Sequence, residues 1–241
     1  MSERIWTLAP GDLGALWDEC RRCFYLAAGA GFPRPAPVAA EPVGRHLLAA
    51  LGGRRTERVA RGMPAGVVAV GHRSVQSRPL SIGVPDGSYR CVIRGALDAT
   101  LALDDGTLGV LEVASAQPFA PAGPRRLHAW AHALESAGAG KVTALGALVF
   151  EPAPAAPDGP VVVSGAWTWE PVERDDSAFY GFLAEALSLL ERPEPPGGTP
   201  LCPWCVYRDA SRRTGYGWLT TRPGGRCSGR PPPSGPPPSR R

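Results

Sequence analysis

Hydrophobic and polar positions alternate most clearly over residues 89–103 and 107–114, and this alternation predicts two β-strands. Apolar side chains at helical spacing predict helices over residues 12–26 and 124–136. The same patterns predict further helices over 43–51 and 177–191 and further strands over 66–71, 79–83, 142–150 and 161–170. Strands and helices mixed in this order predict an α/β fold, with a mixed, mostly antiparallel sheet flanked by helices.

The two strongest predicted strands form a hairpin that carries acidic side chains. In the first strand, Leu97 and Leu101 share one face and Asp98 lies on the other. A three-residue turn with Gly106 in the left-handed position pairs Asp98 with Glu112, which puts both carboxylates on one face, roughly 5 Å apart at Cβ. A two-residue turn would put them on opposite faces. We favour the three-residue turn, because such turns prefer glycine in that position.

Two facing carboxylates in a mostly apolar sheet are costly unless a cation joins them. Mg²⁺ is a suitable cation, because it prefers one or two carboxylates together with water and phosphate oxygens. Such a site can orient a water molecule and stabilise charge on a scissile phosphate. The hairpin alone leaves a second interpretation open, in which Asp98 and Glu112 are two solvated strand carboxylates.

Short motifs around the hairpin resemble those of the PD-(D/E)XK nuclease superfamily, specifically its RecB-like branch. The segment Gly95–Asp98 resembles the GxxD motif of that branch, and Leu111–Ser115 resembles its (D/E)xK segment. The segment Arg126–Ala131 is similar to the QLxAYA helix that follows. The resemblance runs from about residue 6 to 208 and implies a restriction-endonuclease-like core.

The resemblance implies a site that binds Mg²⁺ or Mn²⁺ through Asp98, Glu112 and the Val113 carbonyl and hydrolyses phosphodiesters in DNA, in single strands or at ends. The chain departs from the family at Ala114, where a lysine should position the attacking water. Arg126, in the place of the motif glutamine, can offset charge there as a catalytic group, but a guanidinium is poor at proton transfer.

We therefore expect a RecB-like, metal-dependent DNA nuclease whose activity is weakened or lost. The alternative is a catalytically dead nucleic-acid-binding or scaffold protein that retains the fold. The chain has a single lysine, Lys141, and nothing in the sequence places it in the site.

Four of the six cysteines form two CxxC pairs, Cys20 with Cys23 and Cys202 with Cys205, one near each end of the predicted domain. Thiolates at this spacing can converge on one tetrahedral Zn²⁺ or on one [4Fe–4S] cluster. Both pairs also resemble the cysteine segments that bracket the iron–sulfur members of the family, which favours the cluster over zinc. His128 and His132, four residues apart, suggest a weaker second zinc-binding face.

Charge is distributed unevenly along the 241 residues. Seven of the 26 lysine and arginine side chains and no acidic side chain lie from Ser211 onward, which leaves 19 basic and 22 acidic side chains in residues 1–210. We expect one nuclease-like domain over 1–210, closed by the cysteine pairs, and a disordered Gly/Pro/Arg-rich tail over 211–241 that is a candidate for phosphate contacts. No signal peptide or membrane span is legible, so we expect a cytoplasmic protein.

Overall fold

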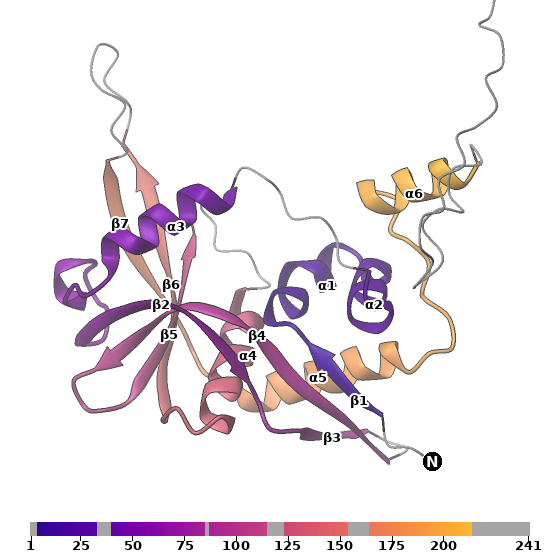
Figure 1. Cartoon of the computed structure of the whole chain (residues 1–241), viewed down its shortest axis with the longest axis horizontal. Helices are drawn as coiled ribbons and strands as arrows, with labels where there is room; N and C mark the ends of the chain where they lie inside the picture. The colour runs from indigo at the N-terminus through magenta and orange to yellow at the C-terminus, as the bar shows by residue number, and fades with distance from the viewer. Residues whose placement is uncertain (1–3, 33–39, 85–86, 115–122, 154–163, 214–241) are drawn as a thin grey trace, which may run out of the picture.

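A computed structural model describes residues 4–32, 40–84, 87–114, 123–153 and 164–213, and these form a seven-stranded mixed sheet with helices on its faces (Figure 1). The strands are β1 (Ile5–Leu8), β2 (Gly66–Gln76), β3 (Leu80–Val84), β4 (Gly87–Leu103), β5 (Leu108–Ala114), β6 (Val142–Pro152) and β7 (Gly165–Val172). The helices are η1 (Asp12–Leu16), α1 (Trp17–Glu19), α2 (Arg21–Ala30), α3 (Ala40–Leu51), η2 (Thr56–Arg58), α4 (Gly123–Ser136), α5 (Asp176–Leu190) and α6 (Pro203–Arg213).

Strand β4 organises the sheet, because it pairs with four other strands. It is antiparallel to β2, β3 and β5 and parallel to β1. After β5 the chain crosses through α4 and returns as β6, parallel to β5, and β7 then pairs antiparallel to β6. The predicted α/β fold with a mixed, mostly antiparallel sheet flanked by helices is confirmed.

The turn between β4 and β5 has the predicted three-residue form. Gly106 has a φ of 80°, and its N–H donates to the carbonyl of Leu103 at 3.0 Å. The Leu103 N–H donates to the Thr107 carbonyl at 3.0 Å, which closes the hairpin. The β4–β5 ladder runs from Ala102–Leu108 to Thr100–Val110 and ends before it reaches Asp98 and Glu112.

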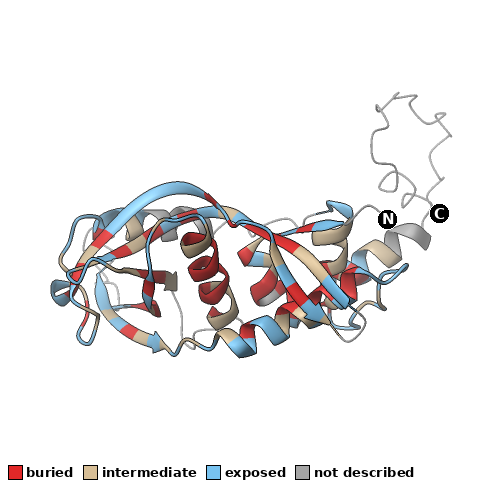
Figure 2. Cartoon of the chain, turned by 90° about the horizontal axis from the view of Figure 1, so that it is seen from below, coloured by how far each residue is buried: buried red, intermediate tan, exposed pale blue. Residues whose placement is uncertain are grey.

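The buried side chains form two clusters, one on each face of the sheet (Figure 2). The α4-side core joins the sheet to η1, α2, α4 and α5, with Ile93, Val110 and Leu134 among its buried members. The α3-side core is smaller and holds Leu51 of α3 together with Leu148 of β6. Helices therefore cover both faces of the sheet.

Strand β4 contributes to both cores, and this overturns one sequence-based expectation. Leu97 is buried in the α4-side core, whereas Leu101 is buried in the α3-side core, so the expectation that they share a face is wrong. The pairing with β2 shifts register between Val70 and Arg73, opposite Leu97 and Ala99, and strict alternation fails where the ladder is irregular. Asp98 lies at this irregularity.

Two other segments differ from expectation. The helix expected over 12–26 is interrupted at Cys20, whose φ of −164° and ψ of 108° are extended, so that α2 begins after it. At the other end, α6 continues to Arg213, past the expected start of the tail at residue 211, and residues 214–241 lie outside the described residues. Within the described part of the chain, no helix is both long and apolar enough to cross a membrane.

Gly95 of β4 is needed because the indole of Trp130 in α4 packs against its backbone. A Cβ at this position would lie 2.8 Å from the indole and 3.2 Å from Cδ of Pro10. We expect Gly95→Ala to lower the free energy of unfolding by about 1–3 kcal/mol through overpacking, as measured by urea denaturation. The same substitution should cost less in a Trp130→Leu background, and an equal cost in both backgrounds would contradict the proposed clash.

Candidate metal centre and acidic site

The four cysteines of the CxxC pairs come together although about 180 residues separate the two pairs along the chain. The Sγ atoms of Cys20 and Cys205 are 3.6 Å apart, as are those of Cys23 and Cys202, and the Cys23–Cys205 distance is 3.8 Å. All four ligand atoms lie within 4.8 Å of one another. All four residues are buried, and the predicted convergence of the two pairs is confirmed.

The break in the helix at Cys20 shapes this cluster. The extended backbone at Cys20 ends α1 and begins α2, so Cys20 precedes the helix while Cys23 lies in its first turn. Burial raises the pKa of the Cys20 thiol, but hydrogen bonds from the backbone of Thr199 and Cys23, with those from the neighbouring thiols, outweigh burial and lower it to about 6. Burial raises the pKa of Cys205 to about 11.

Four buried sulfur atoms are a donor set suited to a soft or borderline metal ion. Thiolate is the form of cysteine that binds metals, and the lowered pKa of Cys20 makes thiolate available at neutral pH. Among the described residues, these four cysteines are the one group of three or more cysteine, histidine or acidic side chains close enough to hold a metal ion. The cluster can therefore hold a metal ion.

Helix α6 depends on this cluster for its attachment. Of the side chains from Leu201 to Asp209, only those of Cys202 and Cys205 are buried. An ion pair joins Arg22 of α2 to Asp209 of α6 at 3.7 Å, and the rest of the helix lies at the edge of the molecule beyond α2, away from the sheet (Figure 1). A metal at the cluster would therefore tie the C-terminal helix to the N-terminal helices.

Glu112 on β5 is paired with Arg126 on α4, both of which the sequence predicted as site residues. The Arg126 Nε donates to Oε2 of Glu112 at 2.6 Å, and the other carboxylate oxygen pairs with Nη2 of the same guanidinium. The Glu112 side chain is 18% exposed. Because the fork of the guanidinium engages both oxygens, this pair neutralises Glu112 within the protein.

Asp98 makes a separate ion pair on the surface of the sheet. Its Oδ1 lies 3.0 Å from Nδ1 of His72 on β2, and its side chain is 62% exposed. In the described residues Asp98 and Glu112 thus have different partners. Val113 and Ala114 are half-buried at the end of β5, where the Val113 carbonyl would complete the predicted ligand set.

Lys141 does not replace the missing motif lysine. The Lys141 carbonyl accepts from the N–H of Leu108 at 2.8 Å, which places it at the start of β5. Ala114 is at the opposite end of this strand, about 20 Å away at roughly 3.3 Å per residue. The site therefore has an arginine, Arg126, and no lysine.

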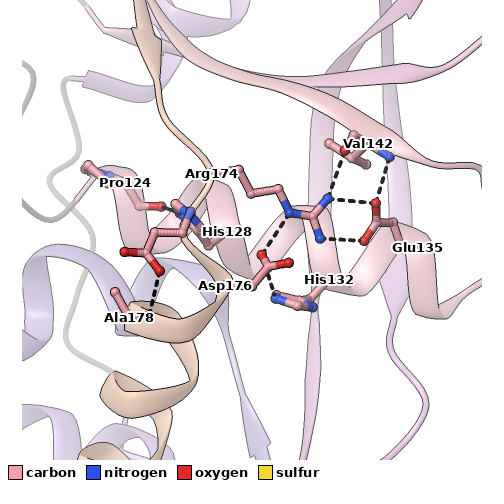
Figure 3. Close-up of polar contacts among 9 residues, drawn as sticks. Pro124, His128, His132, Glu135, Val142, Arg174, Asp176 and Ala178 are labelled. Carbon is pink, nitrogen blue, oxygen red and sulfur yellow. Dashed lines mark hydrogen bonds and ion pairs between the residues drawn. The ribbon is translucent and has the colours of Figure 1, made fainter.

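The histidines of α4 are structural. His128 Nδ1 lies 2.7 Å from the Pro124 carbonyl, and its Nε2 accepts from the backbone N–H of Asp175 at 2.8 Å (Figure 3). Both ring nitrogens are therefore engaged. His132 is buried, stacks on Phe179 with ring centroids 5.2 Å apart, and burial lowers its pKa. The interpretation of this pair as a zinc-binding face is wrong.

Sequence analysis missed a polar network centred on Arg174, just before α5 (Figure 3). Arg174 donates to both carboxylate oxygens of Glu135, at 2.8 and 2.7 Å, to Asp176 at 2.8 Å and to the Val142 carbonyl at 2.8 Å. Glu135 also accepts from the Val142 N–H at 2.8 Å. Since Glu135 and Arg174 are 39 residues apart, no local motif could have revealed the pair. The network joins α4 to β6 and α5.

We expect Arg174→Met to lower the free energy of unfolding at neutral pH by about 2 kcal/mol, because it leaves the half-buried Glu135 without its cation. The hydrogen bond from Arg174 holds the pKa of Glu135 below its usual value of 4.5. A lowered pKa contributes stability above the unfolded value, and this contribution is lost as the pH falls through the folded value. The difference between wild type and variant should shrink below about pH 5, as measured by urea denaturation across pH; a constant difference would refute this role.

Comparisons with known proteins give little beyond the fold. No protein-family model matches the chain, and no curated protein matches it. Among solved structures, the crystal structure of SSO0001 is similar, with 15% sequence identity and a TM-score of 0.44 over 86% of this chain and 86% of that one. We draw no functional conclusion from this similarity.

Proposed function

We propose that this chain is a nucleic-acid-binding protein built on a nuclease-like core whose cleavage activity is weakened or lost. One observation carries the proposal: Arg126 occupies both carboxylate oxygens of Glu112, which the resemblance assigns to metal binding. A cation at the hairpin would have to displace a charge-assisted, two-pronged pair that is already formed. Ala114 supplies no replacement for the lysine of the motif.

The order of elements supports the nuclease-like core. The GxxD-like segment lies on β4, the Glu112 segment on β5, and the helix that carries Arg126 connects β5 to the parallel strand β6. Gly95 of the first motif packs against Trp130 of the helix motif. These motifs therefore meet in space as well as in sequence order, which a chance match of short patterns does not require.

The direct test is a binding and cleavage assay on the full chain with labelled single- and double-stranded DNA. We expect binding by fluorescence anisotropy, and little or no cleavage with either Mg²⁺ or Mn²⁺. Efficient cleavage that Asp98→Ala abolishes would overturn the proposal and establish the second candidate below. Absence of any nucleic-acid binding would overturn it in favour of a scaffold role.

A metal-dependent DNA nuclease is the second candidate function. It is favoured by the three-residue turn at Gly106, whose register carries Asp98 and Glu112 toward one another along the hairpin. In this candidate, Mg²⁺ or Mn²⁺ held by Asp98, Glu112 and the Val113 carbonyl would supply positive charge at the scissile phosphate. Arg126, whose side chain is 36% exposed, would have to release Glu112 and turn toward the phosphate.

For the cysteine cluster we propose a single tetrahedral ion, Zn²⁺, rather than the [4Fe–4S] cluster that the resemblance favours. Zn–S bonds of about 2.3 Å in a tetrahedron put sulfur atoms about 3.8 Å apart, close to the 3.6, 3.6 and 3.8 Å distances between the thiols. In a [4Fe–4S] cluster each thiolate binds a different iron, so the sulfurs stand much farther apart. Such thiols persist in a reducing compartment, which supports the expected cytoplasmic location.

A further inference from the structure

Helix α6 and the residue pair before it present apolar side chains that folded proteins normally bury. Leu201, Trp204, Val206 and Tyr207 are 91%, 37%, 54% and 73% exposed, respectively. Isolated apolar side chains are common on protein surfaces, but a group this dense marks an interaction site. Neither the cysteine cluster nor the acidic hairpin uses these side chains.

The aromatic members of this group lie on one face of the helix. Trp204 and Tyr207 are three residues apart, so their side chains are neighbours on the helix surface. Cys205 is buried in the cluster on the inner side, so the aromatic face is directed away from the metal site. The cysteine cluster thus fixes the orientation of this aromatic surface.

Charge indicates what kind of partner this surface suits. From Ser211 onward, directly after the aromatic residues, the sequence contains seven arginines and no acidic residue. Residues 1–210 carry more acidic than basic side chains, 22 against 19. A polyanion would therefore be attracted to the α6 end of the chain. Rings that stack beside arginines fit a strand whose bases are unpaired, whereas a duplex hides its base faces.

We propose that α6 is a stacking platform for single-stranded nucleic acid, in which bases stack on Trp204 and Tyr207 and the arginines that follow in the sequence contact phosphates. The inference rests on the proposed nucleic-acid partner and assigns the contact to a surface separate from the acidic hairpin. The interaction needs no divalent cation, so it is measurable whether or not the hairpin cleaves.

The test measures binding of the full-length, metal-containing protein to fluorescein-labelled oligodeoxythymidine, without added divalent cation. We expect the Trp204→Ala/Tyr207→Ala variant to raise Kd for the single strand at least about tenfold, since base stacking on such side chains contributes strongly to affinity. The Trp204→Phe/Tyr207→Phe variant should retain most of the affinity. Matched controls are Phe32→Ala and Tyr180→Ala, which remove rings 45% and 38% exposed elsewhere and should leave Kd unchanged.

Three outcomes would overturn the inference. An unchanged Kd in the Trp204→Ala/Tyr207→Ala variant, while wild type binds, would overturn the α6 assignment alone. If wild type binds no nucleic acid, the proposed function fails as well. A wild-type dimer in sedimentation experiments that the alanine variant dissociates would assign the surface to a second copy of the chain.

Discussion

Replacing Cys20 and Cys205 with serine should destabilise the protein by several kcal/mol and release α6. Structural zinc sites contribute apparent binding free energies of about 10–16 kcal/mol to folding in small domains, and α6 buries little besides its two thiols. A loss of several kcal/mol corresponds to a fall in Tm of about 10 °C or more for a chain of this size. Calorimetry would measure the fall, and limited proteolysis would show cleavage in the linker near Thr199.

Cys91 supplies the matched control for this prediction. It is also a buried cysteine, on β4, but it lies outside the cluster, and burial raises its pKa to about 12. Cys91→Ala should cost only the small cavity that a missing sulfur leaves, and the bound metal should remain. If Cys91→Ala and Cys20→Ser/Cys205→Ser lower Tm equally, the cluster contributes packing alone and does not act as a metal clasp.

The second large effect that we expect is a gain of cleavage in the Ala114→Lys/Arg126→Gln variant. The arginine that neutralises Glu112 is removed, and a lysine returns to the place where the resemblance puts one. Positioned acid–base groups contribute about 10²–10⁴-fold to rate, so we expect Mg²⁺- or Mn²⁺-dependent DNA cleavage at least about 100-fold above wild type. Either substitution alone should give less, because each leaves one of the two defects in place.

Adding Asp98→Ala to the double variant should return cleavage to the wild-type level, which guards against a contaminating nuclease. Thermal unfolding of each variant should remain cooperative, because Arg126 is 36% exposed and Ala114 is half-buried at the end of β5. No gain of cleavage from a folded double variant would mean that the hairpin is not a dormant catalytic site. The binding-protein interpretation would then stand without the nuclease-like chemistry.

Local patterns in the sequence were enough to predict the hairpin. The Asp-Asp-Gly turn requires a left-handed residue, and Gly106 adopts it with a φ of 80°. The long-range convergence of the CxxC pairs was also predictable, because thiols at this spacing have few other roles in a reducing environment. Both predictions depended on requirements that a few residues impose on the backbone or on a ligand.

Three features of the site depended on contacts that a linear pattern does not contain. The pairing of Arg126 with Glu112 depends on how α4 packs against β5, which the spacing along the sequence does not determine. The extended backbone at Cys20 breaks a pattern that looks helical throughout, because the thiol has to reach Cys205. Leu97 and Leu101 face different cores because β4 pairs irregularly with β2, and alternation assumes a regular ladder.

Metal analysis of the anaerobically purified full-length protein, combined with its visible absorption spectrum, tests the central claim most directly. If Cys20, Cys23, Cys202 and Cys205 hold one tetrahedral Zn²⁺, the protein will be colourless and contain one zinc ion per chain. The Cys20→Ser/Cys205→Ser variant will lose that ion, whereas Cys91→Ala will keep it. A brown protein with iron and acid-labile sulfide in equal amounts would contradict the single-ion centre and establish an iron–sulfur cluster instead.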